Sequence, residues 1–297
     1  VRFNARCLKE DIPLVIELLG EQLRSPAFNE SDLENLKKRL VGNLQRAKEN
    51  TRAQASGRFS RIIYPESHPN YSREIDDEIA DVEKTSVADL QTYHKNSYGL
   101  GNMLVVAVGD VDNAILLKAL QDAFGDWNQS DLTIPVRTSS ANDISSTTQY
   151  ITMEDKTSVD MFLGVPIGID RKHEDYYALM VGNYILGGNF AARLMQTVRD
   201  QMGLTYGIYS SIRGVGNGND GYWSVWGTFA PNLLQEGKRA TLDQINNWVK
   251  GITIEELNAK KETIKGSYKV GLATTGGLAG QILMNTEKGY EDIMLDD

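Results

Sequence analysis

Cysteine and histidine are scarce in this chain, and their scarcity restricts the chemistry it can perform. Cys7 is the one cysteine among 297 residues, so neither an intrachain disulfide nor a cluster of thiolate ligands can form. The histidines His68, His94 and His173 are widely separated in the sequence. The helical metal motifs that place two histidines side by side are therefore absent from these 297 residues.

Basic residues and long apolar runs are also lacking. The chain has 31 lysines and arginines against 40 aspartates and glutamates, a formal net charge of −9. Such a chain is a poor partner for a nucleic-acid backbone or an anionic membrane surface. No apolar run approaches the roughly 20 residues of a membrane-spanning helix. We therefore expect neither nucleic acid nor a membrane as partner, and the length favours two domains.

The first residues have the pattern of a β-strand. Apolar side chains alternate at Val1, Phe3, Ala5 and Cys7, which predicts a strand over residues 1–8. A strand at the start of a chain needs pairing partners, and Val1 is not an initiator methionine. We therefore expect the chain to be a piece of a longer product.

An internal repeat organises the remainder. A pattern of leucine, lysine and glycine in residues 32–42 recurs in residues 256–266, with Leu33 and Leu257 lying 224 positions apart. The same offset places residues 1–8 over a strand that begins at Val225, and it places a predicted helix over residues 12–23 on residues 236–247. Three elements in one register predict a duplication, with about 80 residues expected before Val1.

Each copy has the sequence pattern of an α+β fold. Ser31 is a candidate N-cap of a long helix, since Glu34 follows three residues later. Further helices are predicted over residues 85–98, 174–186 and 190–202. Strands are predicted over residues 103–109, 148–154, 160–166, 204–213 and 221–230. The polar residues 126–146 are typical of a linker, so we expect the C-terminal part of one domain in residues 1–125 and a second domain in residues 147–297.

Two segments of the sequence resemble segments of a known protein family. Residues 187–210 read GGNFAARLMQTVRDQMGLTYGIYS, and residues 98–110 read YGLGNMLVVAVGD. Together with smaller matches at residues 26–28, 68–69 and 277–278, they resemble the insulinase/pitrilysin family of zinc metallopeptidases, which includes the mitochondrial processing peptidases. The resemblance implies two homologous domains, each a mostly antiparallel sheet flanked by helices.

The resemblance also implies catalytic residues. In that family an arginine and a tyrosine seven residues apart face the zinc site of the other domain or of a partner subunit, and Arg199 and Tyr206 have this spacing. A guanidinium and a phenol can donate hydrogen bonds to a tetrahedral oxyanion or to the substrate backbone. Structural roles remain open for both, because arginine suits the last turn of a helix and tyrosine packs well in strands. On the same elements, we expect Arg193 to form a salt bridge and Tyr209 to belong to the core.

The metal ligands of that family do not match this sequence. The family's inverted His-x-x-Glu-His motif is absent, and the position of its distal glutamate falls at Asn43. A neutral amide is a poor zinc ligand, and Glu34 and Glu49 lie elsewhere on the same predicted helix. We therefore expect no metal ligand in this chain, with zinc held by a partner subunit or by a segment upstream of Val1.

Two further motifs have competing interpretations. Gly187 and Gly188 could cradle a phosphate at a helix N-terminus, but the full nucleotide fingerprints are absent, which favours a helix stop. The aromatic strand over residues 222–229 could line a peptide-binding wall, whereas packing is the commoner role of aromatic residues in strands. Substrate-binding residues are not identified by the sequence.

Three functions are compatible with these features. The leading hypothesis is a non-metal-binding subunit of a zinc-dependent peptidase, inactive alone, that donates Arg199 and Tyr206 to the active site of its partner. The alternatives are a complete zinc peptidase whose metal motif precedes Val1, and a structural or peptide-binding protein of the same fold. The resemblance implies peptide substrates and either a zinc-bearing subunit of the same family or self-association. It favours a periplasmic location, because bacterial paired members are often exported.

Overall fold

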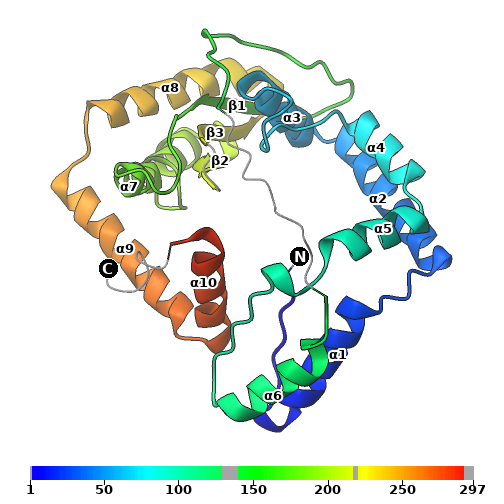
Figure 1. Cartoon of the computed structure of the whole chain (residues 1–297). Helices are drawn as coiled ribbons and strands as arrows, with labels where there is room; N and C mark the ends of the chain where they lie inside the picture. The colour runs from blue at the N-terminus through cyan, green and yellow to red at the C-terminus, as the bar shows by residue number, and fades with distance from the viewer. Residues whose placement is uncertain (1, 129–139, 217–219, 291–297) are drawn as a thin grey trace. The chain divides into compact units, whose positions relative to one another are not determined.

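The computed structural model describes residues 2–128, 140–216 and 220–290 (Figure 1). These residues divide into two compact units, which are considered separately. Unit 1 comprises residues 1–38, 84–135 and 266–297, and unit 2 comprises residues 39–83 and 136–265. Within the described ranges, no helix is both long enough and apolar enough to cross a membrane.

Unit 2 is built on a three-stranded antiparallel sheet. The strands are β1 (Val159–Pro166), β2 (Thr205–Arg213) and β3 (Tyr222–Phe229), and β3 lies between the other two. Phe229 is opposite Val159 on one side and Thr205 on the other, which fixes the register of both pairings. The α+β fold expected from the sequence is confirmed.

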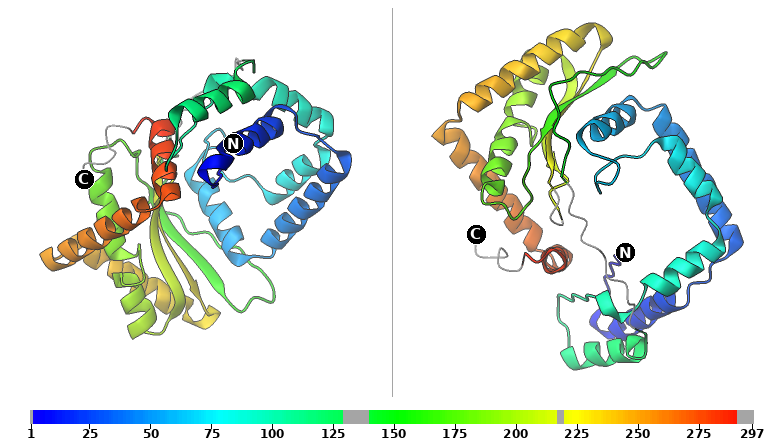
Figure 2. Two further views of the ribbon diagram at one scale, coloured as in Figure 1. Left: turned by 90° about the horizontal axis from the view of Figure 1, so that it is seen from below. Right: turned by 45° about the horizontal axis from the view of Figure 1, so that its top comes forward.

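Helices cover both faces of this sheet, as Figure 2 shows. On one face lie α7 (Tyr176–Leu186), the segment η3 (Met195–Gln201) and α8 (Leu234–Lys250). Their apolar side chains form the core together with Ile208 of β2 and Val225 of β3, both fully buried. On the other face α3 (Thr51–Ile63) packs against β1 through the rings of Phe59 and Phe162, 5.8 Å apart. The helix α4 (Ile75–Lys84) follows α3 in the chain.

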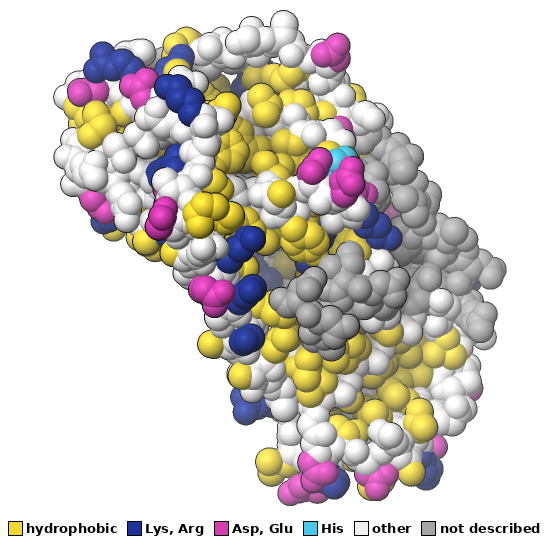
Figure 3. Space-filling model, turned by 90° about the vertical axis from the view of Figure 1, so that its left-hand side faces the viewer, with side chains coloured by type: hydrophobic (Ala, Val, Ile, Leu, Met, Phe, Trp, Pro, Cys, Tyr) yellow, Lys and Arg dark blue, Asp and Glu magenta, His cyan; other side chains and the backbone are white. Residues whose placement is uncertain are grey.

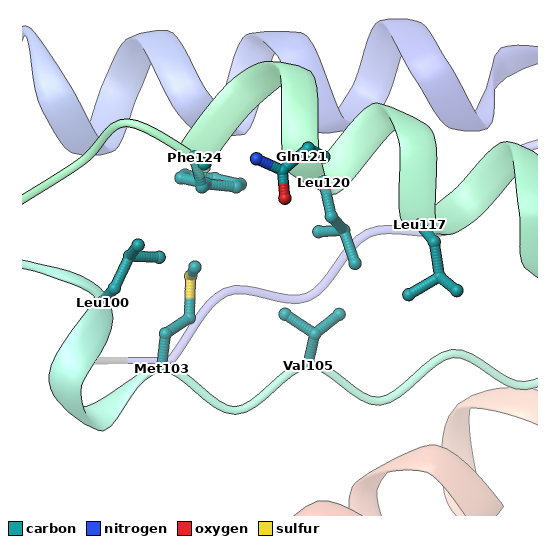
Figure 4. A pocket seen from close by; sticks show the side chains of 8 residues that line it. Leu100, Met103, Val105, Leu117, Leu120, Gln121 and Phe124 are labelled. Atoms are coloured by element: carbon teal, nitrogen blue, oxygen red, sulfur yellow. The ribbon is translucent and has the colours of Figure 1, made fainter.

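Unit 1 contains α1 (Ile12–Arg24), α5 (Val87–Ser97), α6 (Asn113–Phe124) and α10 (Thr275–Lys288). The helices α1 and α6 approach closely at Gly20, where an added Cβ would come within 3.2 Å of the Cβ of Ala123. Beside α6 lies an apolar cavity of about 290 Å³. Leu117, Leu120 and Phe124 point into it from α6, and Leu100, Met103 and Val105 point into it from the preceding segment (Figure 4).

Apolar side chains remain exposed in both units. Leu8 and Leu117 of unit 1 are each 65% exposed, and Phe190 of unit 2 is 70% exposed. On the face displayed in Figure 3, hydrophobic side chains reach the surface between dispersed acidic and basic ones. This mixture of charges differs from the continuous basic surface that binds nucleic acid.

The helices repeat in the predicted register. The helix α2 (Glu30–Lys48) corresponds to α9 (Ile254–Leu272) with an offset of 224 at both ends. With the same offset, α1 falls within the range of α8, and α3 begins at the position of α10. The helix α2 begins one residue before the predicted N-cap Ser31, so that assignment is wrong.

Several predicted strands are absent, whereas those of unit 2 are confirmed. Residues 2–8, 103–109 and 148–154 form no strand, although their side-chain pattern is that of one. A strand requires backbone hydrogen bonds to a neighbour, and no described segment pairs with these residues. The strands predicted over residues 160–166, 204–213 and 221–230 correspond to β1, β2 and β3.

The predicted linker is described only at its ends. Residues 129–139 lie outside the described part of the chain. At the far end, the Asn142 N–H donates to the Ile63 carbonyl oxygen at 2.7 Å, and the Ala141 N–H donates to the Asp220 carboxylate. These bonds fix residue 142 against the end of α3 and residue 141 against the segment before β3, both in unit 2. The proposed division into domains remains a prediction.

Candidate functional site

Arg199 lies in a helical segment with an unusually wide turn. Residues 190–202 were expected to form an α-helix, but residues 195–201 form the π-helix η3 instead. The Met202 N–H therefore donates to the carbonyl oxygen of Thr197, five residues earlier. Met195 and Val198 are fully buried and anchor the segment, while the Arg199 side chain is 36% exposed. Because π-turns are frequent at functional sites, this geometry supports a role for the segment beyond packing.

Gly203 connects this helix to the edge strand β2. Its φ of +64° lies in the left-handed region, which glycine adopts without the steric penalty of a Cβ. The Leu204 N–H then donates to the Val198 carbonyl oxygen at 3.0 Å and closes the turn. The turn brings the start of β2 next to the last turn of η3.

Tyr206 occupies a β-bulge at the start of β2. Thr205 is opposite Phe229 and Gly207 is opposite Thr228, so Tyr206 is the extra residue without a cross-strand partner. Its side chain is 86% exposed. Bulges recur next to active sites, where they redirect a side chain away from the regular pleat.

The buried side chain of Thr205 holds this bulge. Its hydroxyl lies within donating distance of the carbonyl oxygens of Gly207, at 3.0 Å, and of Thr228. The same oxygen accepts a hydrogen bond from the Gly207 N–H at 3.1 Å. Sequence reasoning missed Thr205, although a hydroxyl residue before Tyr-Gly at the start of a strand is compatible with a bulge.

Arg199 and Tyr206 lie next to each other in the folded chain. The guanidinium carbon of Arg199 is 5.8 Å from the centre of the Tyr206 ring, within the range of a cation–π contact. Arg199 also donates to the Asp200 carboxylate at 3.1 Å. Together the two side chains present a cationic group with several N–H donors and a phenolic O–H donor on one side of unit 2.

Arg193, the second arginine of the helix predicted over residues 190–202, forms the expected salt bridge. Its Nε donates to Glu256 Oε1 at 2.7 Å and its Nη2 donates to Oε2 at 2.6 Å, a bidentate pair that joins the residues after α7 to the start of α9. The Glu256 carboxylate also accepts from the Thr253 N–H. The hydrogen bonds from Arg193 lower the pKa of Glu256 to about 2. Arg193 is therefore engaged in the fold.

Tyr209 and the aromatic strand combine packing with partial exposure. Tyr209, which was expected in the core, is only half-buried and packs at its margin. Trp223 and Phe229 are buried, so packing accounts for this face of β3. On the opposite face the rings of Tyr209 and Trp226 stack in parallel planes, with centroids 6.0 Å apart.

Gly187 ends α7, which confirms the helix-stop interpretation. Its N–H donates to the Asn183 carbonyl oxygen, and its own carbonyl oxygen accepts from the Ser210 N–H at 3.0 Å. An added Cβ would lie 2.5 Å from the Ser210 nitrogen. Glycine is thus required by the close approach of β2.

The described residues do not fit a zinc ion. No group of three or more histidine, cysteine, aspartate or glutamate side chains within the described ranges could hold a metal. Asn43, at the predicted position of the distal ligand, is exposed on α2 and accepts a hydrogen bond from Arg46. His68 is buried and contacts Asp220 at 3.2 Å, where it supports the fold. No zinc-dependent step is therefore assigned to these side chains.

Comparison with known proteins places these features in a family. Residues 84–264 match the family model described as the peptidase M16 inactive domain. An uncharacterized zinc protease of Streptomyces coelicolor is 21% identical, with 99% of this chain and 64% of the relative covered. A non-peptidase homolog of Helicobacter pylori is 24% identical, with 88% of this chain and 59% of the relative covered. The chain thus spans about three fifths of the length of these relatives.

The fold has a counterpart among solved structures. The crystal structure of a peptidase M16 inactive domain from Pseudomonas fluorescens superimposes with a TM-score of 0.78 at 24% sequence identity, covering 93% of this chain and 64% of that chain. At this identity the likeness establishes the fold.

Proposed function

Because the chain belongs to the peptidase M16 inactive-domain family, we propose that it is a component of a zinc-dependent peptidase that binds no metal itself and supplies Arg199 and Tyr206 to the active site of a zinc-bearing partner. We further propose that residues 1–125 and 147–297 belong to two homologous peptidase-like domains. The reaction would be hydrolysis of a peptide bond. The partner would be a subunit of the same family or a second copy of the chain.

The observation that carries the proposal is the exposure of Tyr206 at a bulge beside Arg199. A tyrosine that is 86% exposed contributes little buried area to the fold, yet Thr205 and the bulge position it. The phenol and the guanidinium can donate hydrogen bonds to a peptide carbonyl oxygen, which gains negative charge as the carbonyl is attacked. Donors fixed before the reaction stabilise that charge without reorganisation.

The family description is compatible with a partner. It names an inactive domain of a peptidase, which implies that the catalytic residues lie elsewhere, and the Streptomyces relative is named a zinc protease. The described residues offer no zinc ligand set, which is compatible with metal on another polypeptide. A pair of donors without a metal has a chemical use only where another group activates the attacking water.

A second candidate is a complete zinc peptidase whose metal motif belongs to a longer form of the chain. It is favoured by the names of relatives that are zinc proteases and of which this chain spans about three fifths. A third candidate, a peptide-binding protein without catalysis, is favoured by the non-peptidase homolog of Helicobacter pylori.

The experiment that tests the proposal is reconstitution with the zinc-bearing subunit. We expect the chain alone to cleave no peptide and activity to appear on addition of that subunit. Tyr206→Phe should lower kcat/KM of the assembled peptidase about 100-fold, because one oxyanion donor is lost. The matched control is Tyr93→Phe, which removes the hydroxyl of another exposed tyrosine and should leave kcat/KM unchanged. Full activity of the assembled Tyr206→Phe enzyme would contradict the proposed role.

A further inference from the structure

Four side chains from separate segments of unit 2 form a continuous row of contacts. Phe190 follows α7, Tyr209 belongs to β2, Trp226 belongs to β3 and Arg52 belongs to α3. The ring of Phe190 meets that of Tyr209 edge to face at 5.8 Å, and the ring of Tyr209 is parallel to that of Trp226 at 6.0 Å. The Arg52 guanidinium carbon lies 3.8 Å from the centre of the Trp226 ring. We call these four residues the aromatic row.

Phe190 is largely exposed despite its ring contact with Tyr209. Its side chain is 70% exposed, although burial of a phenylalanine side chain stabilises a fold. It comes directly after the turn whose glycine, Gly187, is required by the approach of β2. Phe190 is therefore displayed on a short segment tied to the sheet, in contact with a ring of β2.

The far end of the row is fixed in place. The Trp226 Nε1–H donates to Asp160 Oδ1 at 2.6 Å, and the same carboxylate accepts from the Thr51 hydroxyl at 2.5 Å. Thr51 precedes Arg52 at the start of α3, so one carboxylate of β1 positions both the indole and the segment that carries the cation. Such preorganisation reduces the conformational entropy that these side chains would lose when a ligand binds.

The middle of the row lies against Gly207, the residue that follows Tyr206. A Cβ placed on Gly207 would lie 3.6 Å from Tyr209 Cε2 and 3.7 Å from Trp226 Cζ3. The backbone that follows the bulge therefore runs directly beside both rings, and glycine leaves their edges uncovered. A peptide whose carbonyl oxygen meets Tyr206 would place a neighbouring side chain at this row.

The chemistry of the row favours an aromatic side chain of the ligand. Aromatic rings bind one another by offset stacking and by edge-to-face contacts. The row offers the exposed ring of Phe190 beside the half-buried rings of Tyr209 and Trp226. The net charge of −9 disfavours strongly acidic peptides. Resting on the proposed function, we infer that Phe190, Tyr209, Trp226 and Arg52 form a subsite for an aromatic side chain of the peptide that Arg199 and Tyr206 contact.

Peptide binding to the complete 297-residue chain tests this inference. Two fluorescently labelled decapeptides of equal charge, identical except for one central phenylalanine or alanine, are titrated and followed by anisotropy. We expect the phenylalanine peptide to bind about 10-fold more tightly. Phe190→Ala should reduce this preference to less than about 3-fold. The control Tyr150→Ala removes another exposed aromatic side chain of unit 2 and should leave the preference unchanged.

Three results would overturn the inference: equal affinity of the wild-type chain for the two peptides, no binding of either peptide up to 1 mM, or an unchanged preference in Phe190→Ala. Phe190 is exposed, so its replacement should leave the fold intact, and Arg52→Gln provides a second test at the other end of the row. The role of Arg199 and Tyr206 is judged separately, by activity of the assembled peptidase. If Tyr206→Phe leaves that activity intact while the preference still depends on Phe190, the proposed function fails and the peptide subsite stands without it.

Discussion

At the scale of single residues, the exposure of Tyr206 depends on a side chain that faces the interior. The Thr205 hydroxyl connects the backbone of Gly207 to that of Thr228 across the bulge. Without these bonds, polar backbone groups next to the bulge would lose partners in a buried position. Thr205 thus positions Tyr206 through the backbone of the bulge.

Replacement of the Thr205 hydroxyl tests whether it positions Tyr206, because the phenol of Tyr206 itself stays unchanged. Thr205→Val keeps the shape of the side chain, and we expect it to lower the free energy of unfolding by about 1–3 kcal/mol and to reduce kcat/KM of the assembled peptidase. Thr205→Ser keeps the hydroxyl and should restore most of kcat/KM. Urea unfolding and kinetics of the two variants provide the measurement. Equal loss of activity in both variants would show that the hydroxyl does not position Tyr206.

At the scale of elements, the sequence predicted those that depend on contacts between near neighbours in the chain better than those that depend on distant partners. The helix α5 was predicted closely because its signals are local: Ser86 caps it, and Asp89 completes a capping box. The strand predicted over residues 1–8 was wrong because pairing requires a distant partner, which alternation cannot supply. The sequence predicted a regular α-helix where η3 forms a π-turn, with Met195 and Val198 buried beneath it.

The candidate site shows the same division. The spacing of Arg199 and Tyr206 was visible in the sequence, and the family resemblance implied a catalytic role for the pair. Phe190 and Arg52 escaped notice because their contacts with Tyr209 and Trp226 join segments far apart in the chain. Sequence patterns predicted the elements that carry the site, whereas the row across them required the folded sheet.

The ion pair between Arg193 and Glu256 of α9 predicts a pH dependence of the free energy of unfolding. The pKa of Glu256 falls from its ordinary value of 4.5 to about 2 in the fold, so the pair stabilises the folded state above pH 4.5 and loses this effect as the pH falls towards 2. Glu256→Gln should lower the free energy of unfolding by about 1 kcal/mol at pH 7, because the pair is partly exposed.

Denaturant unfolding from pH 7 to pH 2 measures this effect. The difference between wild type and Glu256→Gln should shrink as the pH falls from about 5 towards 2. A difference of constant size over this range would show that protonation of Glu256 is not linked to folding. The control Glu255→Gln changes a neighbouring exposed carboxylate and should show no such trend.

At the scale of the whole molecule, the two units differ in the extent of their cores. The main cluster of buried apolar residues joins η3, β2, β3 and α8, all within unit 2. In unit 1 apolar side chains of α6, such as Leu117, remain exposed. Regions with few buried contacts open more readily than regions with a packed core.

Native-state hydrogen exchange should therefore distinguish the units. We expect the amides of β3 to exchange at least about 100-fold more slowly than those of α6, because opening of β3 requires exposure of the core. Mass spectrometry of deuterated peptides measures the rates. Equal protection of β3 and α6 would mean that the two units open in a single cooperative step.

The central claim, that this chain lends hydrogen-bond donors to a zinc site held by another polypeptide, is tested most directly by kcat/KM of the assembled peptidase with Arg199→Ala. The account predicts a loss of about 100-fold, with partial recovery in Arg199→Lys, because a single ammonium replaces the forked guanidinium. Retention of wild-type kcat/KM by Arg199→Ala, in a complex of unchanged stability, would contradict it.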